Sequence, residues 1–133
     1  MNTYEEKKSL LLEMIAFSTV DGHLQKREYE FLFRIANELN IEKGGFNDLF
    51  YQELPKLPIR TDFLRVQQFY RLAVLMHCDA TLHLKESATI KEIAIRMGLN
   101  SGLSKRILKK IEKSPKAIIS ADVLMRIFKE ERN

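Results

Sequence analysis

Two pairs of acidic residues recur at the same spacing, and they are the residues with the clearest possible chemistry. Asp21 is followed by Glu28, and 58 residues further on Asp79 is followed by Glu86. Carboxylate oxygens are the ligands that hard cations such as Ca²⁺ and Mg²⁺ prefer, and these ions take several at once. Brought together, the two pairs would supply several such ligands. We therefore predict a divalent-cation site formed by Asp21, Glu28, Asp79 and Glu86.

The same carboxylates also have a purely structural interpretation, which stays open. Each glutamate is expected in the first turn of a helix, where a negative charge interacts favourably with the helix dipole, by about 0.3–1 kcal/mol. An aspartate before a glycine, as in Asp21-Gly22, is also common in turns. Lys26 and Arg27 next to Glu28 lower the local negative potential. The bends are therefore either helix-stabilising turns or a cation site of reduced affinity.

The repeat extends to the helices that would position these carboxylates. In both copies an apolar helix runs into the aspartate, and a second helix carries the glutamate and ends on an Ile-Ala pair, Ile35-Ala36 or Ile93-Ala94. Apolar residues three and four apart are typical of helices, and no segment alternates as a strand would. The pattern predicts an all-α fold, a compact bundle of about seven helices built from two pseudo-symmetric helical hairpins.

The chain length is that of one domain, so we expect a single helical domain over residues 1–133. The first hairpin is predicted at about residues 3–40 and the second at about 61–99. Basic C-terminal helices follow at about residues 101–131. Within each helix the apolar stripe marks the expected core.

Glycine and capping residues predict where these helices begin and end. Gly22 and Gly98 are expected to end helices, because glycine adopts the positive φ of a helix exit. Gly44-Gly45 is expected to break the chain before a short helix from Phe46 to Leu54. Serine and threonine are preferred at the N-cap, the position just before a helix, because their hydroxyl accepts a hydrogen bond from a backbone N–H of the first turn, whereas glutamine is not preferred there. We therefore predict N-caps at Thr61 and Ser120 and a poor N-cap at Gln25.

Composition excludes several classes of protein. Apolar residues make up 45% of the chain and charged residues 30%, as in ordinary soluble proteins. A single cysteine, Cys78, cannot form an internal disulfide, which fits a reducing compartment. The longest apolar run, Leu72 to Met76, is far shorter than the ~20 residues of a membrane helix. We expect no signal peptide, no membrane span and a cytoplasmic location.

A second metal hypothesis involves four neighbouring residues, His77, Cys78, Asp79 and His83. Histidine and cysteine are typical zinc ligands. His77 and Cys78 are adjacent, however, so on a helix their side chains point about 100° apart. A reactive cysteine would need a neighbouring base and an exposed pocket. We therefore favour a buried structural cysteine here, and we expect that the protein is not an enzyme.

The strongest rival to cation binding is nucleic-acid binding by residues 89–113. Ala94 and Gly98 have the spacing typical of a helix-turn-helix, in which the second helix can contact DNA. The second helix is basic, and so is the C-terminal part of the chain as a whole. Residues 85–133 carry 12 Lys/Arg and 6 Asp/Glu, a net charge of +6. Ser104 occupies a packing position where an apolar residue is expected. A solvated lysine-rich face is the alternative to a phosphate-binding face carrying Lys105, Arg106, Lys109, Lys110 and Lys113.

The first bend also supports a family resemblance. The segment from Ala16 to Leu24, with Glu28 and residues 35–39, resembles the TerB-like domain, named for the tellurite-resistance protein TerB. The resemblance implies a helical bundle of two related halves, a proposed metal site at acidic bends, and a link to tellurite and stress resistance. Gln25, Ala80 and His83 depart from the family pattern.

These observations predict a non-catalytic binding or scaffold protein. The resemblance implies a protein partner and a divalent cation as the ligand at the paired bends. Binding of a nucleic acid through the basic C-terminal helices is the alternative. The two hypotheses place the site in different parts of the chain, so they can be tested separately.

Overall fold

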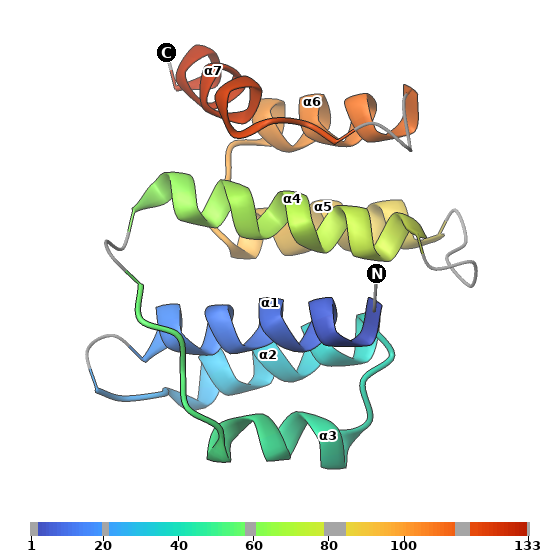
Figure 1. Cartoon of the computed structure of the whole chain (residues 1–133). Coiled ribbons are helices and arrows are strands. Elements are labelled where there is room, and N and C mark those ends of the chain that lie inside the picture. The colour runs from blue at the N-terminus through green and yellow to red at the C-terminus, as the bar shows by residue number, and fades with distance from the viewer. Residues whose placement is uncertain (1–2, 20–21, 58–60, 79–84, 114–117, 133) are drawn as a thin grey trace. The chain divides into compact units, whose positions relative to one another are not determined.

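The computed structural model of the chain is helical and describes residues 3–19, 22–57, 61–78, 85–113 and 118–132 (Figure 1). Seven α-helices and one short 3-10 helix lie within these residues, and no strand does. The predicted all-α helical bundle is therefore confirmed, whereas its pseudo-symmetry stays a prediction. The chain divides into two compact units, Met1–Arg60 and Thr61–Asn133, which we describe in turn.

Unit 1 contains α1 (Thr3–Ser18), α2 (Lys26–Glu38), α3 (Lys43–Asp48) and the 3-10 helix η1 (Leu49–Tyr51). α1 packs along α2, and α3 packs against α2 in turn. η1 continues the chain from α3 and returns to contact α1. Unit 1 is therefore a helical hairpin with a third, short helix laid against its second helix.

The core of unit 1 follows the predicted apolar stripes. An aromatic cluster completes it, in which the ring of Phe46 lies 5.4 Å from Tyr29, 5.6 Å from Phe33 and 5.2 Å from Phe50 between ring centroids. The hydroxyl of Tyr29 also donates a hydrogen bond to Oδ1 of Asn47, at 3.0 Å. The fully buried side chains of unit 1 include Leu10, Leu11, Met14, Ile15, Leu32, Ile35, Leu39, Phe46 and Leu49.

The prediction for Gly44-Gly45 was wrong. Both glycines lie inside α3, which begins at Lys43, and the helical segment ends at Tyr51 rather than at Leu54. A Cβ atom at Gly45 would come 3.3 Å from the hydroxyl oxygen of Tyr4 on α1. Glycine therefore allows the close approach of α3 to α1 at this point and does not break the chain.

Unit 2 contains α4 (Asp62–Cys78), α5 (Lys85–Arg96), α6 (Ser101–Lys113) and α7 (Ala121–Glu131). α6 packs against the other three helices of the unit, α4, α5 and α7. α7 also packs against α4. The helix that carries most of the lysines is thus held by three neighbours.

Side chains at the ends of the helices of unit 2 confirm the predicted caps. The Thr61 hydroxyl oxygen accepts a hydrogen bond from the backbone N–H of Leu64, at 3.2 Å. The Ser120 hydroxyl accepts one from the N–H of Val123, at 3.3 Å. In addition, the hydroxyl of Tyr70 on α4 accepts a hydrogen bond from the N–H of Ile119, at 2.8 Å. The segment leading into α7 is therefore tied to α4.

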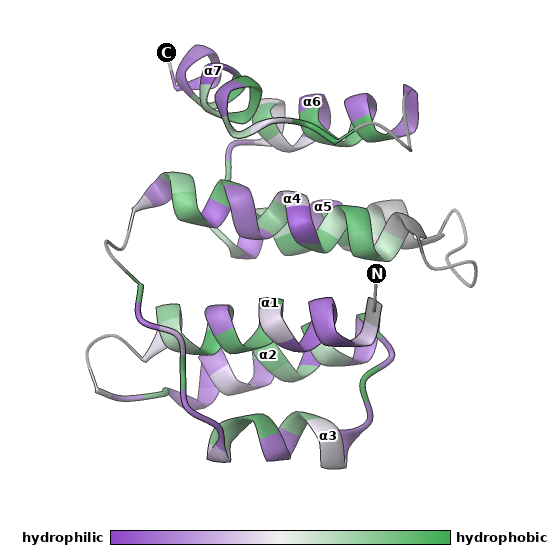
Figure 2. Cartoon of the chain, in the orientation of Figure 1, coloured by the Kyte–Doolittle hydropathy of each residue, from purple (hydrophilic) through white to green (hydrophobic). Residues whose placement is uncertain are grey.

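Apolar residues at helical spacing form the core of unit 2, as predicted. Figure 2 shows hydrophobic and hydrophilic positions alternating around α6 and α7 at the spacing of an amphipathic helix. Within the described residues, no helix combines the length and the apolar character that a membrane crossing requires. The buried apolar side chains include Val66, Phe69, Leu72, Ala73, Met76, Ile90, Ile93, Ala94, Met97, Leu103, Ile107, Ile111, Leu124 and Ile127.

Candidate functional site

The four predicted cation ligands are described only in part. Glu28 lies in the first turn of α2, as predicted, and is half-buried. Glu86 belongs to the first turn of α5, but its side chain is outside the described part of the structure. Asp21 and Asp79 also lie outside the described residues. The two pairs belong to different units of the chain. The four-carboxylate site therefore stays a prediction.

The surroundings of Glu28 bear on both interpretations of the first bend. Gln25 precedes α2 and makes no side-chain capping bond, as predicted. The ammonium group of Lys26 lies 3.9 Å from a carboxylate oxygen of Glu30, one helical turn away. Lys26 thus has Glu30 as its partner. Glu28 occupies the position that favours the helix dipole.

Groups that could bind a transition metal are not found in the described part of the chain. There, no three or more His, Cys, Asp or Glu side chains come together in a way that could hold a metal ion. The side chains of His77, Cys78 and His83 lie outside the described residues. The zinc hypothesis therefore stays untested.

The segment predicted as a helix-turn-helix has two helices joined by a tight turn. α5 ends at Arg96 and α6 begins at Ser101. Gly98 has φ +79°, so it takes the left-handed conformation expected of a glycine after a helix. The N–H of Leu99 donates a hydrogen bond to the carbonyl oxygen of Ala94, at 3.0 Å. These features fix the turn by backbone geometry.

A side chain also caps the beginning of α6. Oδ1 of Asn100 accepts a hydrogen bond from the N–H of Gly102, at 2.7 Å, and a longer one from the N–H of Leu103, at 3.4 Å. Two backbone N–H groups of the first turn are thereby satisfied. The side chain of Asn100 accepts hydrogen bonds from both N–H groups, so these groups already have a partner within the chain.

Ser104 is compatible with this packing although it is polar. Leu103 and Ser104 are both buried, at 2% and 3% exposed. The Ser104 hydroxyl donates a hydrogen bond to the carbonyl oxygen of Ser101, at 3.1 Å, so its burial leaves no unsatisfied donor. The serine that counted against tight helix packing is accommodated within its own helix.

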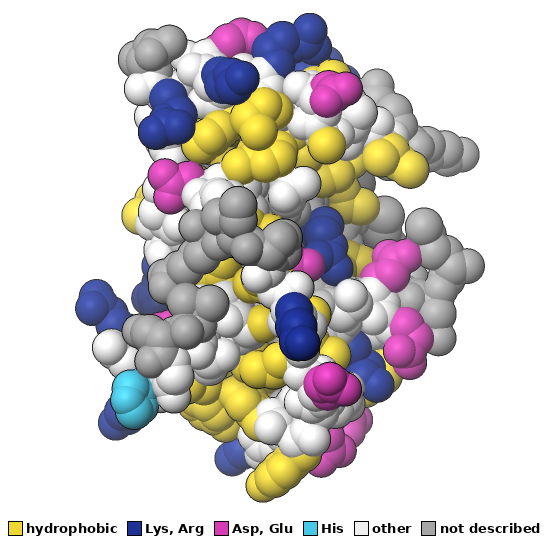
Figure 3. Space-filling view, turned by 60° about the vertical axis from the view of Figure 1, so that its left-hand side comes forward, with side chains coloured by type: hydrophobic (Ala, Val, Ile, Leu, Met, Phe, Trp, Pro, Cys, Tyr) yellow, Lys and Arg dark blue, Asp and Glu magenta, His cyan; other side chains and the backbone are white. Residues whose placement is uncertain are grey.

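The opposite side of α6 is basic and open to solvent. We define the lysine face as Lys105, Lys109, Lys110 and Lys113, all of which are exposed. Three of them are four residues apart and therefore lie along one side of the helix. Among the described residues, no ion pair involves any of the four. Figure 3 shows basic side chains gathered over the C-terminal helices, at the top of the view.

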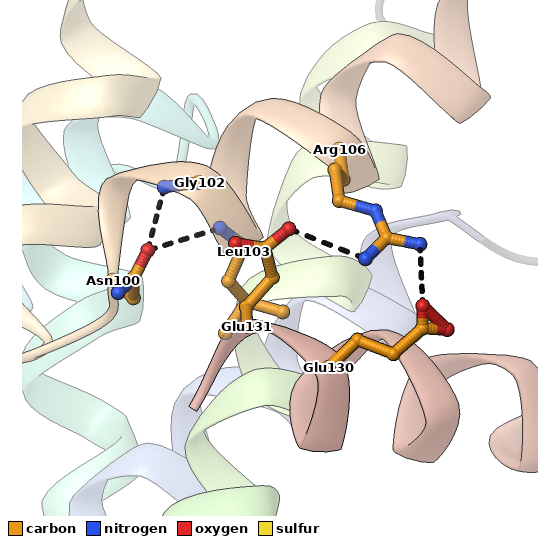
Figure 4. Close-up of polar contacts among 6 residues, drawn as sticks. All are labelled: Asn100, Gly102, Leu103, Arg106, Glu130 and Glu131. Carbon is orange, nitrogen blue, oxygen red and sulfur yellow. Dashed lines mark hydrogen bonds and ion pairs between the residues drawn. The ribbon is translucent and has the colours of Figure 1, made fainter. Parts of the chain in front are cut away.

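Arg106 differs from the neighbouring lysines because two carboxylates hold it. Its guanidinium lies 3.2 Å from Oε1 of Glu131, to which it donates a hydrogen bond, and 3.5 Å from Oε2 of Glu130. Figure 4 shows both glutamates reaching from the end of α7 to the arginine on α6. We call Arg106, Glu130 and Glu131 the arginine clamp. Arg106 was predicted to be part of the basic surface, and the clamp offsets its charge.

Glu131 also lies against the first turn of α6. A Cβ atom at Gly102 would collide with its carboxylate, so a side chain there would displace the end of Glu131 from this position. This places a negative charge at the positive end of the α6 dipole, a stabilising arrangement. Beside it lies a hollow of about 260 Å³, whose lining includes Asp62, Met97 and Arg132.

The sequence analysis missed the two glutamates of the clamp. Glu131 is 25 residues from Arg106 in the chain, and no local periodicity relates them. The available signal was weak, namely a pair of acidic residues at the end of a helix that already carries Asp122 in its first turn. Only the packing of α7 against α6 brings these charges together.

Comparisons with known proteins leave the chain without a family. No protein-family model matches it, and no curated protein or solved structure is significantly similar to it. The TerB-like resemblance therefore rests on the residues of the bends, and it stays a prediction. Function has to be argued from the chain's own surface and charge.

Proposed function

We propose that this protein is a non-catalytic binding protein whose lysine face binds the phosphate backbone of a nucleic acid. The observation that carries the proposal is the row of exposed lysines on α6, which have no acidic partner among the described residues. Lysines that neutralise phosphates release condensed counterions, and this release drives non-specific binding to nucleic acids.

The helix that presents these lysines is firmly held. Leu103, Ile107 and Ile111 on its other side are between 0% and 6% exposed. Asn100 caps its first turn. The lysines therefore project from a fixed helix, so binding need not order the backbone that carries them. Glu112 is the one acidic residue in the sequence of α6, and it limits the positive potential at the end of the lysine face.

The experiment is a titration of a fluorescein-labelled DNA duplex, followed by anisotropy at several salt concentrations. Affinity should fall steeply with salt, with a slope in log K against log salt of about −0.9 for each phosphate neutralised. Lys105→Gln, Lys109→Gln and Lys113→Gln together should reduce the slope by about 3 and weaken binding at every salt concentration.

A matched control separates the lysine face from net charge. Lys26→Gln, Lys43→Gln and Lys56→Gln remove the same charge from exposed lysines of unit 1. This control variant should bind like the unchanged protein. Equal weakening in both triple variants would show that net charge alone matters. If the unchanged protein fails to bind at low salt, the proposal is wrong.

A second candidate function is the predicted binding of a divalent cation at the bends. The observation in its favour is that Glu28 lies half-buried in the first turn of α2, where the sequence predicted it. Such a site would fit the non-catalytic scaffold role that the TerB-like resemblance implies, with a protein partner and a link to tellurite resistance. It needs its own test, because its residues are not those of α6.

Thermal unfolding with and without Ca²⁺ or Mg²⁺ provides this test. A cation that binds only the folded state raises the melting temperature as its concentration increases. Asp21→Asn with Asp79→Asn should abolish the rise. Asp48→Asn with Asp122→Asn removes equal charge elsewhere and should retain it. A rise that survives the first double substitution would exclude the predicted ligands.

A further inference from the structure

The arginine clamp bears on which part of a nucleic acid the protein can contact. Resting on the proposed function, we infer that Glu130 and Glu131 are specificity-determining residues that restrict the lysine face to the phosphate backbone and prevent α6 from reading bases. The binding is then independent of sequence. The reason is the clamp.

Base reading by a helix-turn-helix uses the first turns of its second helix. Those residues enter the major groove and meet the edges of the bases. The first two turns of α6 include Ser101, Gly102, Lys105 and Arg106. Gly102 has no side chain, and the carboxylate of Glu131 occupies the adjacent space.

The polar groups of this turn are already engaged. The N–H groups of Gly102 and Leu103 donate to the side chain of Asn100, as Figure 4 shows. Helix N-terminal N–H groups often hold phosphates, but here they have a partner within the chain. An incoming phosphate would also meet the negative charge of Glu131, 28% exposed beside them.

Arg106 would be the best base-reading side chain of α6, because arginine binds guanine in a bidentate manner. Both of its terminal nitrogens face carboxylates of α7, at 3.2 Å and 3.5 Å. The clamp has one positive and two negative charges, so it repels phosphates. The attractive part of α6 is therefore the lysine face alone, which starts at Lys105 and continues to Lys113.

Direct base reading and backbone binding predict different results with a panel of DNA duplexes of equal length and different sequence. A protein that reads bases loses about fivefold to 100-fold in affinity for each wrong base pair. The unchanged protein should instead bind all duplexes with affinities within about twofold, as expected for purely electrostatic binding. A strong preference for one sequence would overturn the inference while leaving the proposed function intact.

Opening the clamp tests the role of the two glutamates. Glu130→Gln with Glu131→Gln should increase affinity and steepen the salt slope by about one unit, because Arg106 becomes available to a phosphate. Adding Arg106→Gln to this variant should reverse the change in slope. Glu30→Gln with Glu53→Gln changes the net charge equally in unit 1 and should leave the slope unaltered.

A third variant keeps the test decisive if the opened clamp does not fold. Arg106→Gln with Glu131→Gln removes one charge of each sign and should leave the salt slope as it was, because the clamp already holds this arginine away from phosphate. A slope reduced by about one unit would overturn the inference, since Arg106 would then be contacting phosphate in the native protein. If the unchanged protein binds no duplex at all, the proposed function itself is wrong.

Discussion

The two units of the chain end their second helices in the same way but continue differently. In unit 1 the N–H of Ile41 donates to the carbonyl oxygen of Ala36, at 2.9 Å. In unit 2 the N–H of Leu99 donates to that of Ala94, at 3.0 Å, and both partners are displaced by the 58-residue offset of the sequence repeat. The repeat therefore extends to the hydrogen bonds that end the two helices.

The residue in the left-handed conformation also falls at equivalent positions. Asn40 has φ 59° and Gly98 has φ 79°. Glycine adopts this conformation without strain, and asparagine is among the few other residues that tolerate it. The same left-handed backbone conformation is thus adopted by two different residue types.

The third helix is where the units diverge. α3 is a 6-residue helix that begins after Glu42, which makes no capping bond, and it buries Phe46 in the aromatic cluster. α6 is a 13-residue helix that begins after the capping Asn100 and carries the lysine face. α7 packs against it and has no counterpart among the described elements of unit 1. The same turn therefore leads to a short core helix in unit 1 and, in unit 2, to a longer helix that has both a buried side and a charged face.

The largest expected effect comes from the buried residues of the two third helices. Phe46→Ala should lower the free energy of unfolding by about 3–5 kcal/mol and Ile107→Ala by about 2–5 kcal/mol, because each leaves a cavity in a closed core. Urea unfolding measures both values. Hydrogen exchange should locate the first loss in unit 1 and the second in unit 2, and equal loss in both units would remove the distinction between them.

A smaller effect is expected where the second helices end. Gly98→Ala should destabilise by about 1–2 kcal/mol, because alanine is strained at positive φ although the space around it is open. Asn40→Gly should be neutral or stabilising, by less than about 1 kcal/mol. The midpoints of urea unfolding compare the two. A neutral Gly98→Ala would contradict the strained backbone, whatever the result at Asn40.

The next effect concerns the N-caps of the third helices, where we expect changes in stability of about the size that one N-cap contributes. Asn100→Ala removes the side chain that satisfies two N–H groups and should cost about 0.5–2 kcal/mol. Glu42→Asn supplies unit 1 with a comparable cap and should stabilise it by about 1 kcal/mol or less. Thermal unfolding provides the measurement, with Glu42→Ala as the control that should give no gain.

The smallest effect is expected from the ion pairs. Arg106→Gln should lower stability by at most about 1 kcal/mol, because its partners on α7 are partly exposed. Lys26→Gln breaks a pair in unit 1 that is much more exposed, and its effect should be close to zero. A larger loss of stability from Lys26→Gln than from Arg106→Gln would contradict this ranking of the two ion pairs.

Local sequence features were sufficient to predict much of the fold. Helical periodicity identified the buried sides of the helices, from Leu10 in α1 to Ile127 in α7. Hydroxyl residues before helices identified the caps at Thr61 and Ser120, and Gly98 identified a left-handed exit. These features depend on interactions within a few residues of the chain, so the sequence alone determines them.

Other features were decided by contacts between residues far apart in the chain. Gly44 and Gly45 lie within α3 and not in a break, and the hydroxyl of Tyr4 on α1 lies close to where a side chain at Gly45 would begin. Long-range contacts do not yet decide the role of the predicted cation ligands, since three of the four lie wholly or partly outside the described residues. Their interpretation therefore still depends on the sequence.

The sequence by itself determined which residues of α6 are basic and which side of the helix is apolar. Only the tertiary structure decided which of those charges remain available. Lys109 and Arg106 are neighbours on the same helix, but the packing of α7 brings two carboxylates to Arg106, whereas no carboxylate of the described residues pairs with Lys109. The physical reason is that a helix repeat is a local property, whereas the charge opposite a side chain depends on how separate helices pack.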